Sequence, residues 1–481
     1  MVLVNGTSGA TKAMVGGSYN TTQVWKTLSQ YLPSRDPDSD FWWKFSGLHL
    51  ALMLEEAEYP PEKQIEALVF FYHWTAPYLG SAPSATGKPL KWKSMVQPDG
   101  TPIKYSWRWP LDDLNGPEVR YNYEAIGPYA GTDLDPLCQL AAKDLMGRLA
   151  SAITDAHVNN TWFNHFMSTM FEHDNTKLGA AAAQGLRMTS SVLMATEFNR
   201  DGIIFKSYIQ PRLIDYTGVM PADAYEKAMA GIEADSPARA AVHDFLSNSD
   251  EGQSLTPFSI GVDNKDKSRL KWYFSTPRTS FASVRSILTL DGRIQTPHTE
   301  RQLADLDELV KSVLGLPDDF PADQHPAEFL GAKSTYSFVS PTPANPGVAA
   351  PVRPTVPPRY PYYFDVAPRQ KLPGVKWNLP VRHYDRDDLS VAKALTAWME
   401  KQGHGAWCDR YMKLLERLAA ERGIRLRDSR GLQEFISIML KPDGEIDVTS
   451  CFSAHAFGVL PTPDQLSYPR RGTRRRGDDD Y

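Results

Sequence analysis

Apolar and polar residues alternate along several short segments of the chain, as they do in strands with one buried face. In residues 269–274 (RLKWYF), the basic and phenolic side chains share one face, and the leucine, tryptophan and phenylalanine share the other. A similar alternation recurs in residues 102–110, 118–126, 203–211, 374–381, 434–441 and 446–452. These segments predict a sheet with one apolar face and one polar face.

Segments with helical periodicity lie between the predicted strands. Helices are predicted at residues 39–59, 60–74, 135–153 and 298–316, and along a longer run from 387 to 423. The first is expected to begin at a capping Ser39 or Asp40, and the third at Asp135 with Pro136 as its first helical residue. Because helix pairs and strand pairs interleave throughout, and KSY, KWY and KWN recur on strands, the pattern indicates a repeated supersecondary unit.

The polar faces of the predicted strands carry a series of cations. They are Arg120, Lys206, Arg269, Lys271, Lys376 and Lys441, with Tyr208 and Tyr273 beside them. The opposite, apolar faces need cover, and amphipathic helices outside a closed sheet would provide it. Any one of these cations is compatible with an ordinary solvated strand residue, but their repetition on five strands favours a helix-covered barrel with a polar lumen.

A lumen with this many cations predicts a polyanionic ligand, because buried charges without counterions are strongly unfavourable. Diphosphate suits such a site, since arginine grips its oxygens with two hydrogen bonds and lysine adds a point charge. The tyrosines can donate hydrogen bonds or present their ring faces to a cation. The pattern therefore indicates a site that draws diphosphate away from an organic group and shelters the resulting carbocation.

The alternative of another class is a non-catalytic barrel that binds a polyanion such as a phosphoinositide or nucleic acid. Aromatic residues that would stack on bases are scarce between the inward cations, which disfavours nucleic acid. Affinity for diphosphate without turnover of a prenyl donor would distinguish this alternative from an enzyme.

Composition sets limits on this interpretation. The 481 residues are 42% hydrophobic, enough for a large core, and the net charge of −5 gives no general attraction to nucleic acid or membranes. The three cysteines have no CxxC spacing, no stretch suits a signal peptide, and none is apolar for long enough to span a bilayer. We expect a cytoplasmic protein, monomeric or homodimeric. Its predicted parts are disordered residues 1–20, a single barrel domain at 21–465 with a proline-rich loop at about 340–360, and a disordered tail at 466–481.

The sequence lacks the motifs of several common enzyme classes. It contains no GxxxxGK[ST] phosphate loop, no strand-borne GxGxxG, no GxSxG elbow and no HExxH. The DDxxD run that holds magnesium diphosphate in many isoprenoid enzymes is also missing. We therefore expect no cofactor and no obligatory metal, with the protein's own cations in place of magnesium.

The motifs RYNYEAIG, KSYIQPR, RLKWYFSTPRTSFASVRS and VKWNLPVRHYDRDDL resemble those of the fungal dimethylallyltryptophan synthase family of aromatic prenyltransferases. The resemblance extends from FWWKFSGLHLALML to DVTSCF, nearly the whole predicted domain. It implies an α+β fold, a ten-stranded antiparallel β-barrel of repeated αββα units with helices outside and the active site in the lumen. It also implies transfer of a dimethylallyl group from dimethylallyl diphosphate to an aromatic small molecule, without an obligatory metal.

The resemblance carries roles over to individual residues. Diphosphate would bind to Arg120, Lys206, Arg269, Lys271, Lys376 and Lys441, of which the first four are the expected catalytic residues. Tyr208 and Tyr273 would form part of a tyrosine shield around the allyl cation. Asn378 and Cys451 stand where tyrosine is common in the family, which should leave more room in the acceptor pocket.

The acceptor side departs further from the tryptophan-using members. Lys104 stands where they have the glutamate that accepts the indole N–H, and a lysine cannot accept that bond. Leu193 stands, to within one residue, where they have a lysine base. The expected acceptor is therefore a polycyclic secondary metabolite, an indole diterpene or an aromatic polyketide such as a xanthone, and the alternative is tryptophan or a tryptophan-containing cyclic dipeptide. Lys104 is also compatible with a solvated place at the barrel rim, and the released diphosphate, Glu124 and a bound water remain open as proton acceptors.

Overall fold

The computed structural model describes residues 22–84, 92–112, 115–153, 157–184, 188–213, 220–331 and 358–457. The segments predicted to be disordered, 1–20 and 466–481, lie outside these residues, and so does most of the predicted proline-rich loop at about 340–360.

Ten antiparallel strands close into a barrel, in which every strand pairs with its neighbours along the chain and β1 pairs with β10. The strands are β1 (Ile103–Arg108), β2 (Glu118–Tyr123), β3 (Val192–Asn199), β4 (Gly202–Ile209), β5 (Thr256–Asp263), β6 (Leu270–Thr276), β7 (Tyr360–Asp365), β8 (Gly374–Leu379), β9 (Gln433–Leu440) and β10 (Ile446–Ser453). Closure pairs the edges of the sheet with each other, so the strands enclose a lumen.

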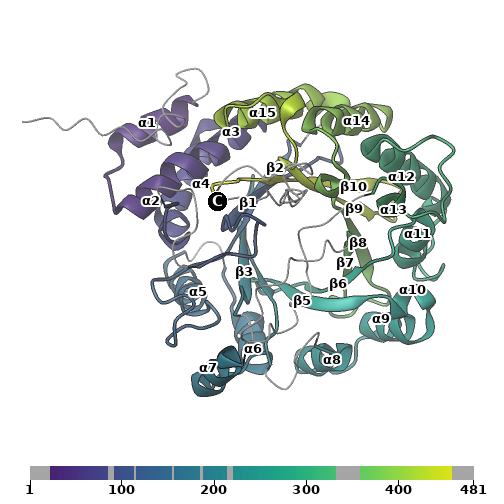
Figure 1. Ribbon diagram of the computed structural model, residues 1–481, viewed down its shortest axis with the longest axis horizontal. Coiled ribbons are helices and arrows are strands. Elements are labelled where there is room, and N and C mark those ends of the chain that lie inside the picture. The colour runs from purple at the N-terminus through teal and green to yellow at the C-terminus, as the bar shows by residue number, and fades with distance from the viewer. Residues whose placement is uncertain are drawn as a thin grey trace, which may run out of the picture.

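Helices surround the barrel in chain order, as the progression of colour in Figure 1 shows. They are α1 (Gln23–Tyr31), α2 (Pro37–Trp42), α3 (Leu48–Glu56), α4 (Pro61–Trp74), α5 (Leu140–Ala152), α6 (Thr161–Thr169), α7 (Asn175–Ala183), α8 (Ala222–Ala230), α9 (Pro237–Asn248), α10 (Asp250–Gln253), α11 (Phe281–Thr289), α12 (Thr299–Leu314), α13 (Pro326–Phe329), α14 (Asp388–Lys401) and α15 (Cys408–Glu421). Each group of helices is followed by a strand pair, which confirms the repeated unit. The recurring KSY, KWY and KWN lie on β4, β6 and β8, the second strand of three successive pairs.

The apolar faces of the strands point outward and form the core with the helices. Trp272 of β6 is fully buried and stacks on Tyr225 of α8, with ring centroids 6.1 Å apart. On β1, Trp107 packs edge-on against Tyr411 of α15 at 6.1 Å. Burial of such large rings stabilises the contact between sheet and helices, and the polar faces are left to line the lumen.

Two helices begin elsewhere than predicted. The cap of α2 is Asp36, whose carboxylate accepts the Ser39 N–H at 2.9 Å, with proline at the next position. Helix α5 begins at Leu140 and not at Asp135. Asp135 still accepts the Leu140 N–H at 3.2 Å, but Cys138 has φ of 52°, a left-handed conformation that cannot be part of an α-helix. The predicted run from 387 to 423 is two helices, α14 and α15.

No helix in the described part of the chain is long and apolar enough to cross a membrane.

Candidate active site

A cavity of about 310 Å³ fills the middle of the barrel, and side chains from all ten strands line it. The volume is in the range of small-molecule sites. Every residue that the sequence predicts for the diphosphate, the allyl cation or the acceptor pocket lies in its wall: Lys104, Arg120, Leu193, Lys206, Tyr208, Arg269, Lys271, Tyr273, Lys376, Asn378, Lys441 and Cys451. Arg269 and Lys441 are predicted to lie on strands, but each lies one residue outside the observed strand. The strand β6 begins after Arg269, and β9 ends before Lys441.

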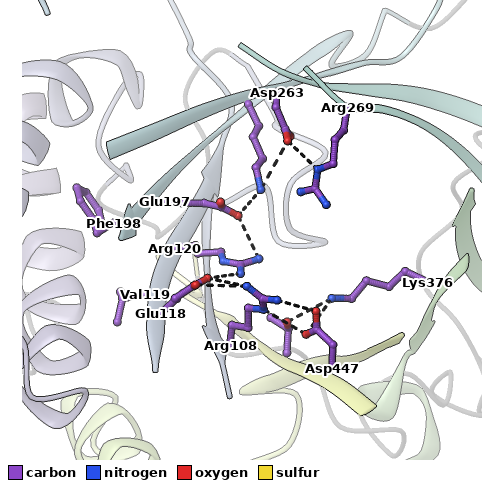
Figure 2. A network of polar contacts seen from close by, with 12 residues as sticks. Arg108, Glu118, Val119, Arg120, Glu197, Phe198, Asp263, Arg269, Lys376 and Asp447 are labelled. Carbon is purple, nitrogen blue, oxygen red and sulfur yellow. Dashed lines mark hydrogen bonds and ion pairs between the residues drawn. The ribbon is translucent and has the colours of Figure 1, made fainter. Parts of the chain in front are cut away.

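Cations and carboxylates alternate around the lumen in what we call the charged belt. Its cations are Arg108, Arg120, Lys206, Arg269, Lys271 and Lys376, and its carboxylates are Glu118, Glu197, Asp263, Asp365 and Asp447. Figure 2 shows most of these side chains pointing toward one another in the lumen, whereas Val119 and Phe198 of the same strands point away from it toward the helices.

Arg108 joins two parts of the belt. Its guanidinium donates to both oxygens of Asp447, at 3.2 and 2.9 Å, and to Glu118 at 3.2 Å. Glu118 in turn accepts a hydrogen bond from Arg120 at 2.7 Å. The other terminal nitrogen of Arg120 lies 3.1 Å from Glu197 Oε1, so one row of charges runs from β10 through β1 and β2 to β3.

The row continues through the next strands. Glu197 forms an ion pair with Lys206 of β4. On β5, Asp263 accepts hydrogen bonds from Lys271 at 2.6 Å and from Arg269 at 2.9 Å. Four of the cations that the sequence predicts for diphosphate, Arg120, Lys206, Arg269 and Lys271, therefore already share carboxylate partners.

The ends of the belt lie on the remaining side of the barrel. Asp365 of β7 is 3.6 Å from Arg269, and Lys376 of β8 is 3.7 Å from Asp447. Lys441, which lines the same cavity, makes no ion pair with a described residue. With Lys441 included, positive side chains outnumber carboxylates, so the lumen still attracts an anion.

The premise that these buried cations lack counterions within the protein is wrong. Buried charges require compensation, and here the protein's carboxylates provide it before any ligand binds. Sequence reasoning missed Glu197, Asp263 and Asp365 because they lie on strands that the alternation pattern does not predict. Arg108 was detectable, because it follows Lys104 at a spacing of four on a predicted strand and so faces the same side.

Burial and ion pairing shift the pKa values of the belt in opposite directions. Burial alone would raise the pKa of Glu197, but Arg120 and Lys206 lower it to about 2. Burial lowers the pKa of Lys206 to about 7, against the attraction of Glu197. Burial also lowers the pKa of Lys271 and of Lys376. The lysines of the belt therefore lose charge more readily than lysines in water.

Tyrosines form a layer next to the charged belt. The rings of Tyr208 and Tyr273 meet edge to face with centroids 5.9 Å apart, and Tyr363 of β7 lies 5.1 Å from Tyr273. Burial raises the pKa of all three, so the phenols stay protonated. Tyr363, absent from the sequence prediction, extends the pair of predicted tyrosines to three.

The part of the lumen farther along the strands from the charged belt is less charged. Leu193, Phe258, Phe435 and Cys451 line it together with Lys104. Lys104 does not lie free at the rim: its side chain is 23% exposed, and its ammonium lies 5.3 Å from the centroid of the Phe435 ring. At Asn378, where the predicted shield lacks a tyrosine, Ser437 donates a hydrogen bond to the side-chain carbonyl.

Comparison with known proteins identifies the family. The tryptophan dimethylallyltransferase profile matches residues 38–414. A prenyltransferase of Pestalotiopsis microspora is 44% identical over 95% of this chain and 98% of its own length. Xanthone prenyltransferase B of Emericella nidulans is 41% identical over 95% of this chain and 96% of its own.

The chain belongs to the dimethylallyltryptophan synthase family of aromatic prenyltransferases. A solved structure of NotF in complex with brevianamide F and DMSPP has the same fold, with a TM-score of 0.71 at 20% identity over 90% of this chain and 98% of that one. The family match and the similarity to named prenyltransferases show that the protein is an enzyme, which excludes the non-catalytic alternative.

Glu124 of the prenyltransferase is not placed to take a proton from a lumen ligand. It is absent from the cavity wall, and its two carboxylate oxygens accept hydrogen bonds from Trp92 at 2.9 Å and Ser190 at 2.6 Å. The sequence leaves Glu124 open as a proton acceptor, but β2 ends at Tyr123, one residue earlier, and the Glu124 side chain does not join the lumen face of that strand.

No group of three or more histidines, cysteines and acidic residues among those described is arranged to hold a metal ion.

Proposed function

We propose that the prenyltransferase transfers a dimethylallyl group from dimethylallyl diphosphate to a polycyclic aromatic acceptor, without an obligatory metal. The observation that supports this most directly is the division of one lumen into a charged belt, a tyrosine layer and a less charged end that holds Lys104. The three parts correspond to the diphosphate, the allyl cation and the acceptor.

The belt suits the departure of diphosphate. As the carbon–oxygen bond of the donor breaks, negative charge develops on the diphosphate, and Arg120, Lys206 and Lys271 are already fixed in orientation by their carboxylates. Fixed donors stabilise developing charge more than mobile ones, because they need no reorganisation during the reaction. In this proposal the protein cations take the part of magnesium.

The tyrosine layer suits the allyl cation. Tyr208, Tyr273 and Tyr363 present aromatic rings, which attract a cation by their quadrupole, and their enclosure keeps water away from it. The acceptor ring then forms a carbon–carbon bond to the cation and loses the proton from that carbon. We assign this proton to the released diphosphate or to a bound water.

The acceptor end favours an oxygenated polycycle over an indole. Lys104 can only donate, so it pairs with a phenolate or carbonyl oxygen and not with an indole N–H. Leu193 in the same wall supplies apolar contact and no base. The similarity to a xanthone prenyltransferase supports the same class of acceptor, and tryptophan and cyclic dipeptides become the less suitable substrates.

Incubation with dimethylallyl diphosphate and a panel of xanthones, hydroxylated polyketides, indole diterpenes, tryptophan and cyclic dipeptides tests the proposal. Mass spectrometry should detect a single added prenyl group on an oxygenated polycycle, at a kcat/KM well above that for tryptophan. Prenylation of tryptophan or a cyclic dipeptide alone would contradict the proposed acceptor class.

A further inference from the structure

Glu434 is a buried carboxylate directly behind the acceptor end of the lumen. It is 0% exposed and absent from the cavity wall, whereas the next residue, Phe435, lines the cavity. Neither of its carboxylate oxygens accepts a hydrogen bond from a described residue. A buried carboxylate is unfavourable unless cations compensate it, so its neighbours indicate what it does.

Two cations compensate Glu434 from different elements. Arg382, which lies between β8 and α14 and is 3% exposed, has a terminal nitrogen 3.1 Å from Glu434 Oε1. Lys104 of β1 has its ammonium 3.7 Å from the same oxygen. Arg382 alone neutralises the charge of Glu434, so Lys104 adds a second positive charge beside the same carboxylate. Of the two cations, Lys104 is the one that faces the lumen.

Phe435 lies within cation–π distance of both cations. Its ring centroid is 5.3 Å from the Lys104 ammonium and 5.8 Å from the Arg382 guanidinium. The ring face and the carboxylate of Glu434 both attract the ammonium without using its hydrogen-bond donors. The flexible lysine side chain is thereby restricted to one region of the wall.

The donors of Lys104 stay available to a ligand. The 3.7 Å separation from Glu434 is longer than a hydrogen bond, and Lys104 Nζ donates no hydrogen bond to a described residue. An ammonium held by charge but not by hydrogen bonds can direct its N–H groups to an oxygen in the lumen.

We propose that Glu434 is a positioning residue for the acceptor, acting through Lys104 to select molecules with an ionised or hydrogen-bond-accepting oxygen at the less charged end of the lumen. The inference rests on the proposed acceptor class and adds a residue outside the cavity that determines it. A phenolate or a ring carbonyl has the required chemistry, and an unsubstituted indole lacks it.

A double-mutant cycle tests this role. The variants are Glu434→Gln, Lys104→Met and the combination, with kcat/KM measured at saturating donor for a hydroxyxanthone and for an unsubstituted indole. Glu434→Gln should lower kcat/KM for the hydroxyxanthone by about ten-fold in the parent but have little further effect beside Lys104→Met, because coupled residues are not additive. The indole value and the KM for the donor should change little in either background.

The controls separate positioning from stability. Glu56→Gln neutralises another carboxylate that is 0% exposed and paired with arginines. Glu56 is the last residue of α3 and pairs with Arg410 and Arg417 of α15 outside the barrel, so this change should leave the ratio of kcat/KM for the hydroxyxanthone to that for the indole unchanged. If Glu434→Gln fails to fold, the neutral pair Glu434→Gln with Arg382→Gln replaces it in the same cycle.

If Glu434→Gln lowers kcat/KM for the hydroxyxanthone equally in the parent and in Lys104→Met, the positioning role is overturned. An equal fall in kcat/KM for the indole would also overturn it. If Lys104→Met itself leaves the hydroxyxanthone to indole ratio unchanged, the proposed acceptor class fails as well. The two failures are therefore distinguishable.

Discussion

Lys206 lies between two carboxylates, Glu197 and Asp263, and burial lowers its pKa to about 7. A lysine with a lowered pKa is charged below that pH and loses its charge as the pH rises. Because the proposed diphosphate site needs the charged form, kcat/KM for the donor should fall about 15-fold between pH 7 and pH 8.5, the loss of charge of a single group with this pKa.

The replacement Lys206→Arg supplies the control for this prediction. Arginine keeps its charge throughout the range, so the variant should show a flatter profile even if its maximum is lower. Initial rates with acceptor saturating would measure both profiles. Identical slopes for the two proteins would show that Lys206 does not set the pH dependence.

Glu197 compensates Arg120 and Lys206 in the ligand-free protein. Glu197→Gln should therefore lower the free energy of unfolding by about 3 kcal/mol, the effect of leaving buried charges uncompensated. Added pyrophosphate should stabilise the variant more than the parent, because the anion takes the place of the missing carboxylate.

Thermal and denaturant unfolding with and without pyrophosphate measure both effects. The matched control is Glu66→Gln, which breaks an exposed ion pair with Lys63 and should change stability by less than about 1 kcal/mol. A Glu197 variant as stable as the control would mean that the belt cations do not need their carboxylates.

At the scale of a single element, β5 passes close to the tyrosine layer at Gly261. A Cβ added there would lie 3.0 Å from the ring of Tyr273 and 3.2 Å from that of Tyr208. Gly261→Ala should displace both rings and lower kcat by about ten-fold, since a small misplacement of groups around the reacting centre is enough to slow catalysis.

The comparison for this variant is Gly147→Ala in α5, where an added Cβ meets nothing within 4 Å. That change should leave kcat unaltered and stabilise the helix slightly, because alanine loses less entropy than glycine. Single-turnover rates would distinguish slower chemistry from slower product release. Parental kcat in Gly261→Ala would show that the tyrosine rings tolerate displacement.

The strands differ in how well the sequence predicts them. Those with cations facing apolar residues, such as β4, β6 and β8, show the alternation clearly. The alternation pattern does not predict β3, β5 and β7, for physical reasons. On β3 the inward Leu193 and Ala195 are apolar like their outward neighbours, β5 has an irregular register at Pro257, and β7 is aromatic on both faces.

The sequence predicts which side chains line the lumen but not which of them pair with one another. All the predicted cations and tyrosines line the lumen, because their positions on alternating strands determine which way they face. Their pairing with carboxylates and the neighbourhood of Lys104 and Glu434 depend on contacts across the closed barrel, between residues far apart in sequence. Such contacts follow from the register of the whole sheet and not from any local pattern.

For the whole molecule, the charged belt predicts independence from divalent metal. The belt supplies positive charge from β1, β2, β4, β6 and β8, half of the strands of the barrel, so excess EDTA should leave turnover largely intact. The measurement compares initial rates in EDTA with rates after addition of Mg²⁺. Loss of activity that added Mg²⁺ restores would contradict the proposal that protein cations act in its place.

Closure of the barrel also separates two sets of positions along every strand. Outward residues such as Trp272 pack with the helices, whereas their neighbours Lys271 and Tyr273 face the lumen. A substitution in the less charged part of the lumen therefore alters what the enzyme recognises without opening a cavity in the helical core. Leu193, Asn378 and Cys451 are therefore suitable targets for directed evolution toward new acceptors, because substitutions there should change the free energy of unfolding little.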